Sequence, residues 1–172
     1  MQGVLNGGGF HDAEDIDRII MKKALVIISL AFFAVAANAQ SKNPKYDPAL
    51  AYELGADDYG MKQYVLAILK SGSNTTADKA TVDSAFKGHM ANMKRLVTEG
   101  HLIVAGPLKK NDKQYRGIFI LNVPTVEEAA KLVDSDPAVK AKLLDVELYG
   151  WYGSAALPEH QKIHDRIEKM SF

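Results

Sequence analysis

The feature that most restricts how this chain can fold is the order of its apolar segments between residues 64 and 151. Short apolar or alternating runs, which are typical of strands, occur at 64–69, 102–105, 117–123 and 144–151. Segments with helical spacing separate the first run from the second and the third run from the fourth. This order, βαββαβ, predicts an α+β fold of the ferredoxin-like class, with one antiparallel sheet and both helices on one face.

Turn and capping residues predict where the helices begin and end. The first helical segment stops before Gly100, because glycine readily adopts the left-handed conformation that ends many helices. The second follows Thr125 in the pattern of a capping box. Asp136 and Pro137 then match a helix N-cap followed by proline at the first helical position, which predicts a further short helical turn.

The first 39 residues predict an export signal rather than part of the fold. Residues 21–23 are a basic start, residues 24–37 are almost wholly apolar, and residues 37–39 match the small-x-small pattern of a cleavage site. The apolar stretch is shorter than the roughly 20 residues of a membrane helix, so we expect cleavage and no membrane span afterwards; the alternative is an uncleaved anchor. Residues 1–20 would then be an over-extended start, and the mature chain would be periplasmic or extracellular.

The mature chain is expected to have three parts. Residues 40–60 lack a sustained hydrophobic period and form a lead-in segment, residues 61–152 form the α+β domain, and residues 153–172 form an extension with a short amphipathic helix. The chain has no cysteine, so its stability must come from its core or from oligomerisation. Because helices on one face leave the other face of the sheet bare, we expect a homodimer with its sheets face to face, a dimeric α+β barrel.

The charge and the motifs argue against several classes of function. The formal net charge is +0 at pH 7, so no global field attracts nucleic acid. The sequence contains no phosphate loop, no dinucleotide-binding glycine pattern and no zincin motif, and we expect no cofactor. His160 and His164 have the i, i+4 spacing of metal ligands, but a lone pair near a terminus is usually solvated, so we expect no metal.

His89 points most directly to a functional site. Val82, Phe86, His89, Met93 and Leu96 share one helix face at 3.6 residues per turn, and that face should pack on the sheet. A histidine there is either a core residue bonded to a backbone carbonyl or the centre of a site. Because an unperturbed imidazole titrates near about pH 6.5, the second interpretation makes the residue a general acid or base.

Four short motifs, taken together, resemble the YCII-related family: residues 88–92, 99–100, 104–108 and 135–139. The resemblance covers about residues 61–151 and implies a dimeric α+β barrel of ferredoxin-like subunits. It also implies an active-site pair formed by the helix histidine and the aspartate of the Asp-Pro step, here His89 and Asp136. Family members commonly carry arginine three residues before the histidine. This chain has Phe86 there, which removes a candidate anion-binding group.

Other side chains at strand and loop ends complete the predicted site. Gly106 and Pro107 could shape the rim of a pocket, Arg116 could bind an anionic substrate, and Ser73 lies in a loop after the first strand. Each also has an ordinary structural interpretation, as a turn, a solvated arginine or a loop residue. Asp136 can cap a helix, orient the histidine, or do both, since one carboxylate oxygen is enough for the cap.

These expectations support competing functions. The first is an exported enzyme in which His89 transfers a proton on a small molecule and Asp136 orients it, in a lyase- or isomerase-type reaction. The second is a non-catalytic dimeric module of the cell envelope that binds a ligand or partner, with His89 in the core. The third is an exported scaffold without a pocket. A pocket that contains His89 but no nearby carboxylate would favour the second.

Overall fold

The computed structural model describes Arg18, residues 21–23 and residues 43–170. The chain forms two units, Met1–Tyr46 and Asp47–Phe172, and the strands and helices below belong to the second. Most of the predicted leader, including its apolar stretch and cleavage site, lies outside the described residues. Within the described part of the chain, no helix has both the length and the apolar character that crossing a membrane requires.

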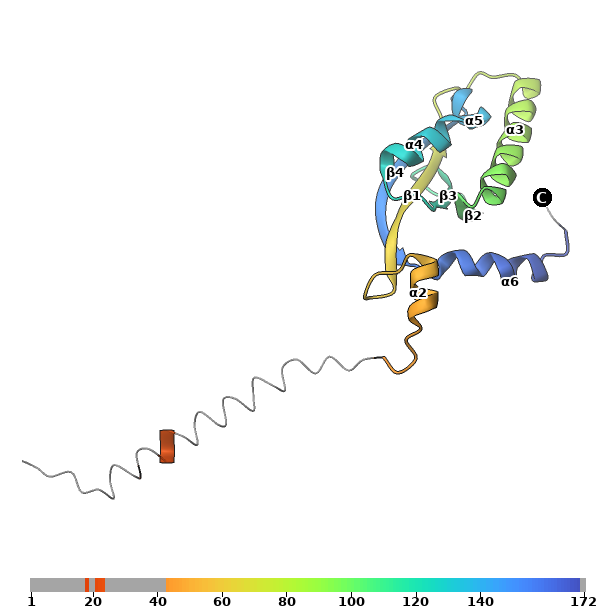
Figure 1. Cartoon of the computed structure of the whole chain (residues 1–172). Helices are drawn as coiled ribbons and strands as arrows, with labels where there is room; N and C mark the ends of the chain where they lie inside the picture. Colours follow the sequence, from red (N-terminus) through yellow and green to blue (C-terminus); the bar gives the residue numbers. More distant parts are fainter. Residues whose placement is uncertain (1–17, 19–20, 24–42, 171–172) are drawn as a thin grey trace, which may run out of the picture. The chain divides into compact units, whose positions relative to one another are not determined.

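Four strands form one antiparallel sheet in the order β2-β3-β1-β4 (Figure 1). The two longest strands, β1 and β4, are neighbours that pair along their whole length, from Met61 opposite Ser154 to Ser71 opposite Leu144. The predicted βαββαβ order and antiparallel sheet are therefore confirmed. The strands are β1 (Met61–Ser71), β2 (Leu102–Pro107), β3 (Tyr115–Leu121) and β4 (Leu144–Ser154).

Three helices connect these strands: α3 (Lys79–Thr98), α4 (Val126–Asp134) and the short α5 (Pro137–Lys140). The side chain of Asp78 caps α3 by accepting a hydrogen bond from the backbone N–H of Thr81 at 2.7 Å. The hydroxyl of Thr125 accepts from the N–H of Glu128 at 3.2 Å, as the capping pattern predicted. Gly100 follows α3 with φ 73°, the left-handed conformation expected of it.

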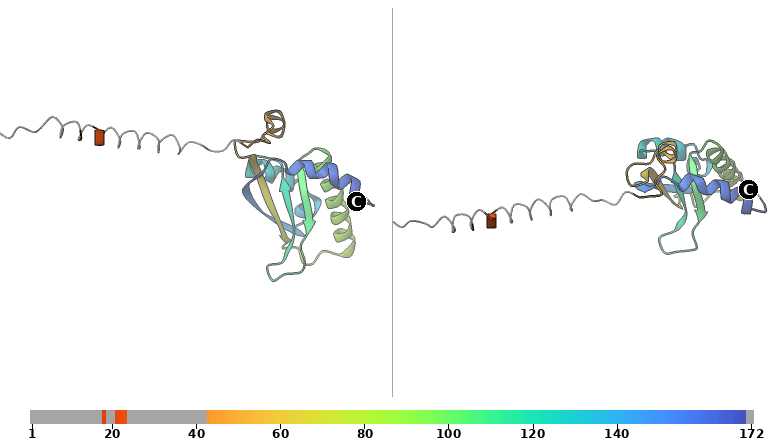
Figure 2. Two further views of the ribbon diagram at one scale, coloured as in Figure 1. Left: turned by 90° about the horizontal axis from the view of Figure 1, so that it is seen from below. Right: turned by 60° about the horizontal axis from the view of Figure 1, so that its bottom comes forward.

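The core lies between the helices and one face of the sheet (Figure 2). Strand residues that point to this face alternate along β1 and β3, and helix residues such as Leu96 and Val133 pack against them. The intervening residues of the same strands point to the opposite face and are mostly half-buried. The buried core residues of β1 and β3 that face the helices are Val65, Ala67, Leu69, Phe119 and Leu121.

Two further helices, α2 and α6, flank this domain. α2 (Pro48–Leu54) lies in the segment where no hydrophobic period was found, and local chemistry accounts for it: Asp47 accepts from two backbone N–H groups, proline opens the helix, and Gly55 closes it at φ 68°. After β4, a 3-10 turn, η1 (Leu157–Glu159), leads into α6 (His160–Ile167). The predicted C-terminal amphipathic helix is therefore present.

Candidate active site

His89 lies on the inner face of α3 and is 9% exposed. Its ring stacks on Phe119 of β3, with ring centroids 6.0 Å apart and an interplanar angle of 17°. Phe86, one turn earlier on α3, meets the ring edge-on at 6.0 Å. The helical period thus packs the imidazole against two aromatic rings.

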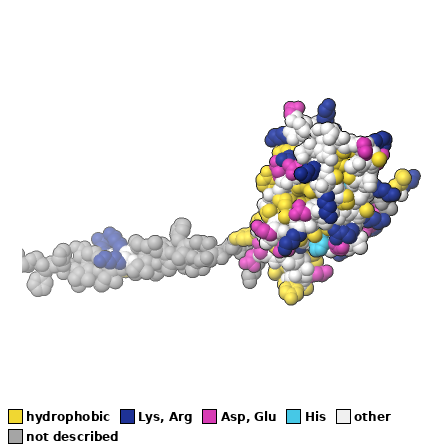
Figure 3. All heavy atoms as spheres, turned by 90° about the horizontal axis from the view of Figure 1, so that it is seen from above, with side chains coloured by type: hydrophobic (Ala, Val, Ile, Leu, Met, Phe, Trp, Pro, Cys, Tyr) yellow, Lys and Arg dark blue, Asp and Glu magenta, His cyan; other side chains and the backbone are white. Residues whose placement is uncertain are grey.

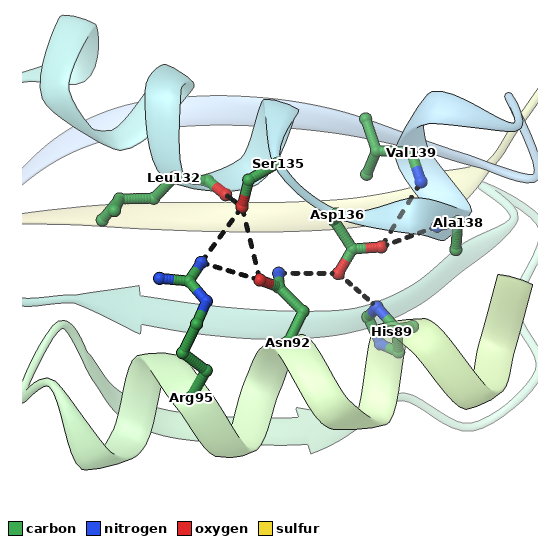
Figure 4. Close-up of polar contacts among 8 residues, drawn as sticks. All are labelled: His89, Asn92, Arg95, Leu132, Ser135, Asp136, Ala138 and Val139. Atoms are coloured by element: carbon green, nitrogen blue, oxygen red, sulfur yellow. Dashed lines mark hydrogen bonds and ion pairs between the residues drawn. The ribbon is translucent and has the colours of Figure 1, made fainter.

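Asp136 lies at the junction of α4 and α5 and is 3% exposed. Its Oδ1 accepts hydrogen bonds from the backbone N–H groups of Ala138 at 2.9 Å and Val139 at 3.4 Å, and so caps α5. Its Oδ2 lies 2.8 Å from Nδ1 of His89 (Figure 4). One carboxylate oxygen of Asp136 therefore caps α5, and the other contacts the imidazole of His89.

This contact determines which nitrogen of His89 carries the proton in the neutral ring. An ionised carboxylate only accepts hydrogen bonds, so Nδ1 donates its proton to Asp136 and Nε2 keeps a lone pair. Among the described residues Nε2 has no hydrogen-bond partner, and no buried polar side-chain atom of these residues is left without one. Nε2 is therefore in contact with solvent and can accept a proton from a bound molecule.

The electrostatics of Asp136 favour its ionised form. Burial by itself would raise the pKa of this carboxyl group. The hydrogen bond and charge of His89, with hydrogen bonds from Asn92 and the backbone of Ala138, outweigh burial and hold the pKa of Asp136 below its ordinary value of 3.8. At neutral pH the site therefore contains a buried carboxylate that accepts the Nδ1–H hydrogen bond of the imidazole.

A second layer of polar groups holds Asp136 in place (Figure 4). The amide Nδ2 of Asn92 donates to Oδ2 of Asp136 at 3.1 Å. The amide oxygen of Asn92 accepts in turn from Nη2 of Arg95 at 2.8 Å. Arg95 also donates to the hydroxyl of Ser135 at 3.2 Å, and that hydroxyl donates to the carbonyl of Leu132 at 2.6 Å. The sequence pattern had predicted no role for these supporting residues.

A spacing signal could have found part of this layer. Asn92 follows His89 by three residues, so both side chains project from the same side of α3. The close packing of α3 against α5 also depends on Gly88, because a Cβ atom there would lie 2.7 Å from Cγ of Pro137. Glycine therefore lets α3 approach α5 closely enough for the histidine and aspartate to meet.

Among the described residues, none of the other predicted site residues hydrogen-bonds His89 or Asp136. Arg116 is exposed and, by strand alternation, lies on the face of the sheet opposite Phe119. Ser73 is exposed in the loop between β1 and α3 and makes no side-chain hydrogen bond among the described residues. Gly106 and Pro107 end β2, and strand register places Gly106 one residue beyond the partner of Phe119. These two lie near the aromatic wall of the site.

Among the described residues, His160 and His164 near the C-terminus are not joined by enough further ligands to form a metal site. The rings of His160 and His164 are 6.4 Å apart, and Nε2 of His164 is 3.7 Å from a carboxylate oxygen of Glu168. Within the described part of the chain, no three His, Asp or Glu side chains are placed to hold a metal ion together.

Comparison with known proteins identifies a family. The family model of the YCII-related domain matches residues 63–151. Among solved structures, the chain is similar to 5-chloro-2-hydroxyhydroquinone dehydrochlorinase from Burkholderia phenoliruptrix AC1100, solved in complex with 2,5-dihydroxybenzoquinone. The two are 22% identical, the match covers 51% of this chain and 92% of the other, and the TM-score is 0.38. A search of curated proteins found no match.

Proposed function

This chain belongs to the YCII-related family, and we propose that it is a small-molecule enzyme in which His89 and Asp136 act as an acid–base pair. The observation that carries the proposal is the 2.8 Å contact between Nδ1 of His89 and Oδ2 of Asp136, with Nε2 open to solvent. A histidine that only filled the core would need no ionised carboxylate, since a backbone carbonyl satisfies Nδ1–H at lower desolvation cost.

The pair is suited to moving a proton on a bound substrate. Nε2 of His89 takes a proton from carbon or oxygen, and the imidazolium that forms is stabilised by the carboxylate of Asp136. The same Nε2–H can then return the proton at a second atom, which is an isomerisation, or protonate a departing group, which completes an elimination. The absence of cysteine from the chain fits a reaction that uses a base rather than a thiol nucleophile.

The alternative function, a non-catalytic binding module, is less well supported. That function would have been favoured by a pocket containing His89 without a carboxylate nearby. Asp136 instead lies in direct contact with the histidine. The two carboxylate oxygens also accept from four donors in all, the imidazole, one side-chain amide and two backbone N–H groups, which fixes the carboxylate against rotation.

Solvent deuterium exchange tests the proposal whatever product the enzyme forms, because it detects proton removal directly. The full chain is incubated in D₂O with a panel of small enolisable carbonyl compounds, and loss of the C–H signal is followed by proton NMR. We expect catalysed exchange for at least one compound, and its loss in His89→Gln, which keeps a polar side chain of similar length. His101→Gln makes the same substitution at a histidine that hydrogen-bonds neither member of the pair; it is the matched control and should exchange at the wild-type rate. Equal exchange by wild type and His89→Gln would refute the acid–base role.

We propose further that the protein is an exported homodimer. The basic, apolar and small-residue order of residues 21–39 supports export. The sheet face away from α3 and α4 supports dimerisation, because Leu66 pairs with Ile120 and Ile68 with Ile118 in an apolar, half-buried patch. Light scattering should give a mass of twice the 18.8 kDa chain, reduced by the mass of any cleaved leader on both chains. Ile118→Lys, which puts a charge in this patch, should give monomers. A monomeric wild type would contradict the dimer.

Figure 3 shows one face of the molecule, on which basic and acidic side chains are interspersed. Together with the formal net charge of +0, this distribution supports a small-molecule substrate rather than a nucleic acid, because nucleic-acid binding draws most of its affinity from a field of one sign. A filter-binding assay with labelled DNA or RNA at about 50 mM salt should therefore detect no retention above that of albumin.

A further inference from the structure

A groove of about 350 Å³ runs between α3, the edge strand β2 and α6. Its volume is at the lower end of the roughly 300–1,000 Å³ range of small-molecule sites. The wall from α3 and β2 is mainly apolar, and the wall from α6 is polar. Figure 2 shows α6 passing close to both other elements. The apolar wall includes Met90, Met93, Val97, Leu102, Val104 and Ala105.

His89 does not itself line the groove, but strand register connects the groove to its ring through Phe119. Ala105, which lines the groove, pairs directly with Phe119 across β2 and β3. Phe119 in turn stacks on His89. Met90 follows the histidine along α3 and also lines the groove. One wall of the groove is therefore continuous with the aromatic packing of the site.

The direction of the imidazole agrees with this placement. Because Nδ1 of His89 contacts Asp136, Nε2, which lies beyond Cε1 of the ring, points away from that carboxylate. The main contacts of α3 are with α5, which carries the aspartate side, and with β2, which carries Ala105. α3 therefore lies between the aspartate side of the site and the strand whose Ala105 lines the groove.

The orientation of α6 is the opposite of what core packing would produce. A surface helix normally buries its apolar stripe. Here Ile163 and Ile167 are 61% and 72% exposed, whereas His160, His164 and neighbouring polar residues line the groove. Polar side chains held against an apolar wall gain little from packing. Their arrangement leaves hydrogen-bonding groups lining the groove.

We propose that this groove is the substrate cleft of the His89–Asp136 pair, that α6 is its specificity-determining wall, and that it takes a neutral, mainly apolar small molecule with a hydrogen-bonding group. The inference rests on the proposed function for the chemistry and on the groove for the substrate class. α6 lies beyond residues 63–151, the part that matches the family domain. The substrate preference it confers therefore belongs to this chain rather than to the domain as a whole.

The charges around the groove favour a neutral molecule over an anion. Its charged lining consists of one lysine, Lys94, and two carboxylates, Asp165 and Glu168. Nδ1 of His160 contacts the carbonyl of Leu157 at 2.9 Å and must donate to it, so in the neutral ring Nε2 of His160 is an acceptor for a hydroxyl. A substrate hydroxyl therefore has a partner, whereas an anion would meet an excess of negative charge.

Two nearly isosteric probes, benzyl alcohol and benzoate, test the substrate class on the full chain labelled with ¹⁵N. We expect benzyl alcohol at millimolar concentration to shift the amide signals of residues 90–98, 102–105 and 160–168, and benzoate to shift them at least fivefold less. Equal or stronger shifts with benzoate would overturn the neutral class. Shifts confined to other parts of the domain would overturn the groove as a binding site.

Chemical modification tests whether the groove leads to the catalytic pair. Diethyl pyrocarbonate acylates an accessible, unprotonated imidazole nitrogen, and the product is located by mass spectrometry. We expect saturating benzyl alcohol to slow modification of His89 severalfold and to leave His101, outside the groove lining, unchanged. Ala105→Phe, which fills the groove beside Phe119, should slow modification of His89 in the same way. If Ala105→Phe does not fold, Val97→Phe is used in its place.

The outcomes separate this inference from the proposed function. If His89 reacts readily but neither benzyl alcohol nor groove filling slows the reaction, the groove is not the cleft, while the acid–base pair stands. If His89 resists the reagent until urea unfolds the chain, Nε2 is closed to ligands, and both the inference and the proposed function fail.

Discussion

Replacing Asp136 by two different residues separates its structural role from its chemical role. Asp136→Ala removes the cap of α5 and leaves both donors to Oδ2, His89 and Asn92, without their acceptor. Losing a helix cap costs about 0.5–2 kcal/mol, and each buried donor left unpaired costs about 1–3 kcal/mol. These terms overlap, because the histidine and Asn92 can reorient, so we expect a loss of about 3–5 kcal/mol in the free energy of unfolding.

Asp136→Asn should behave differently. The new amide keeps an oxygen to cap α5 and turns its NH₂ group toward the site, where His89 can accept from it by moving its own proton to Nε2. The unfolding free energy should then fall by only about 1–2 kcal/mol. Activity should fall by a factor on the order of 10²–10⁴, because Nε2 no longer has a lone pair.

Urea denaturation followed by circular dichroism measures both variants under the same conditions. Repeating Asp136→Ala in a His89→Ala background gives the coupling between the two side chains, which we expect to be about 1–3 kcal/mol. A loss below about 1 kcal/mol for Asp136→Ala, or equal losses for the two substitutions, would refute the assignment of the carboxylate as both cap and partner.

Three further outcomes follow from the site. The pKa of Asp136 is lower in the folded than in the unfolded chain, so its ionised form stabilises the fold above pH 3.8. That stability is lost as the pH falls through the folded-state pKa. The urea midpoint should therefore drop more between about pH 5 and pH 2 in wild type than in Asp136→Asn. Gly88→Ala brings a methyl group against Pro137 and should lower stability by about 1–3 kcal/mol, whereas Gly106→Ala, with open space around it, should melt within about 2 °C of wild type. Asn92→Leu removes one hydrogen bond to the carboxylate and should cost about 1–2 kcal/mol, with an intermediate loss of deuterium exchange.

Local rules determined most of the fold independently of tertiary packing. Short apolar or alternating runs predicted the four strands in their observed order, and Thr125 and Gly100 marked a helix start and a helix end at the observed places. Such signals depend on a few neighbouring residues, so they can be read from the sequence without knowing how the rest of the chain packs. α2 was not predicted although Asp47 and Gly55 signal its ends, because this helix buries none of its residues and so has no hydrophobic period.

The candidate site was likewise predicted in part from the sequence and completed only by the tertiary structure. The sequence alone singled out His89, because a titratable group on an apolar helix face is unusual, and the family resemblance supplied Asp136. Only the tertiary structure decided that these side chains, 47 residues apart, meet at hydrogen-bonding distance, that Arg116 lies on the other face of the sheet, and that α6 turns its polar side inward. Such facts depend on how closely whole elements approach one another, and packing over the entire core sets that approach.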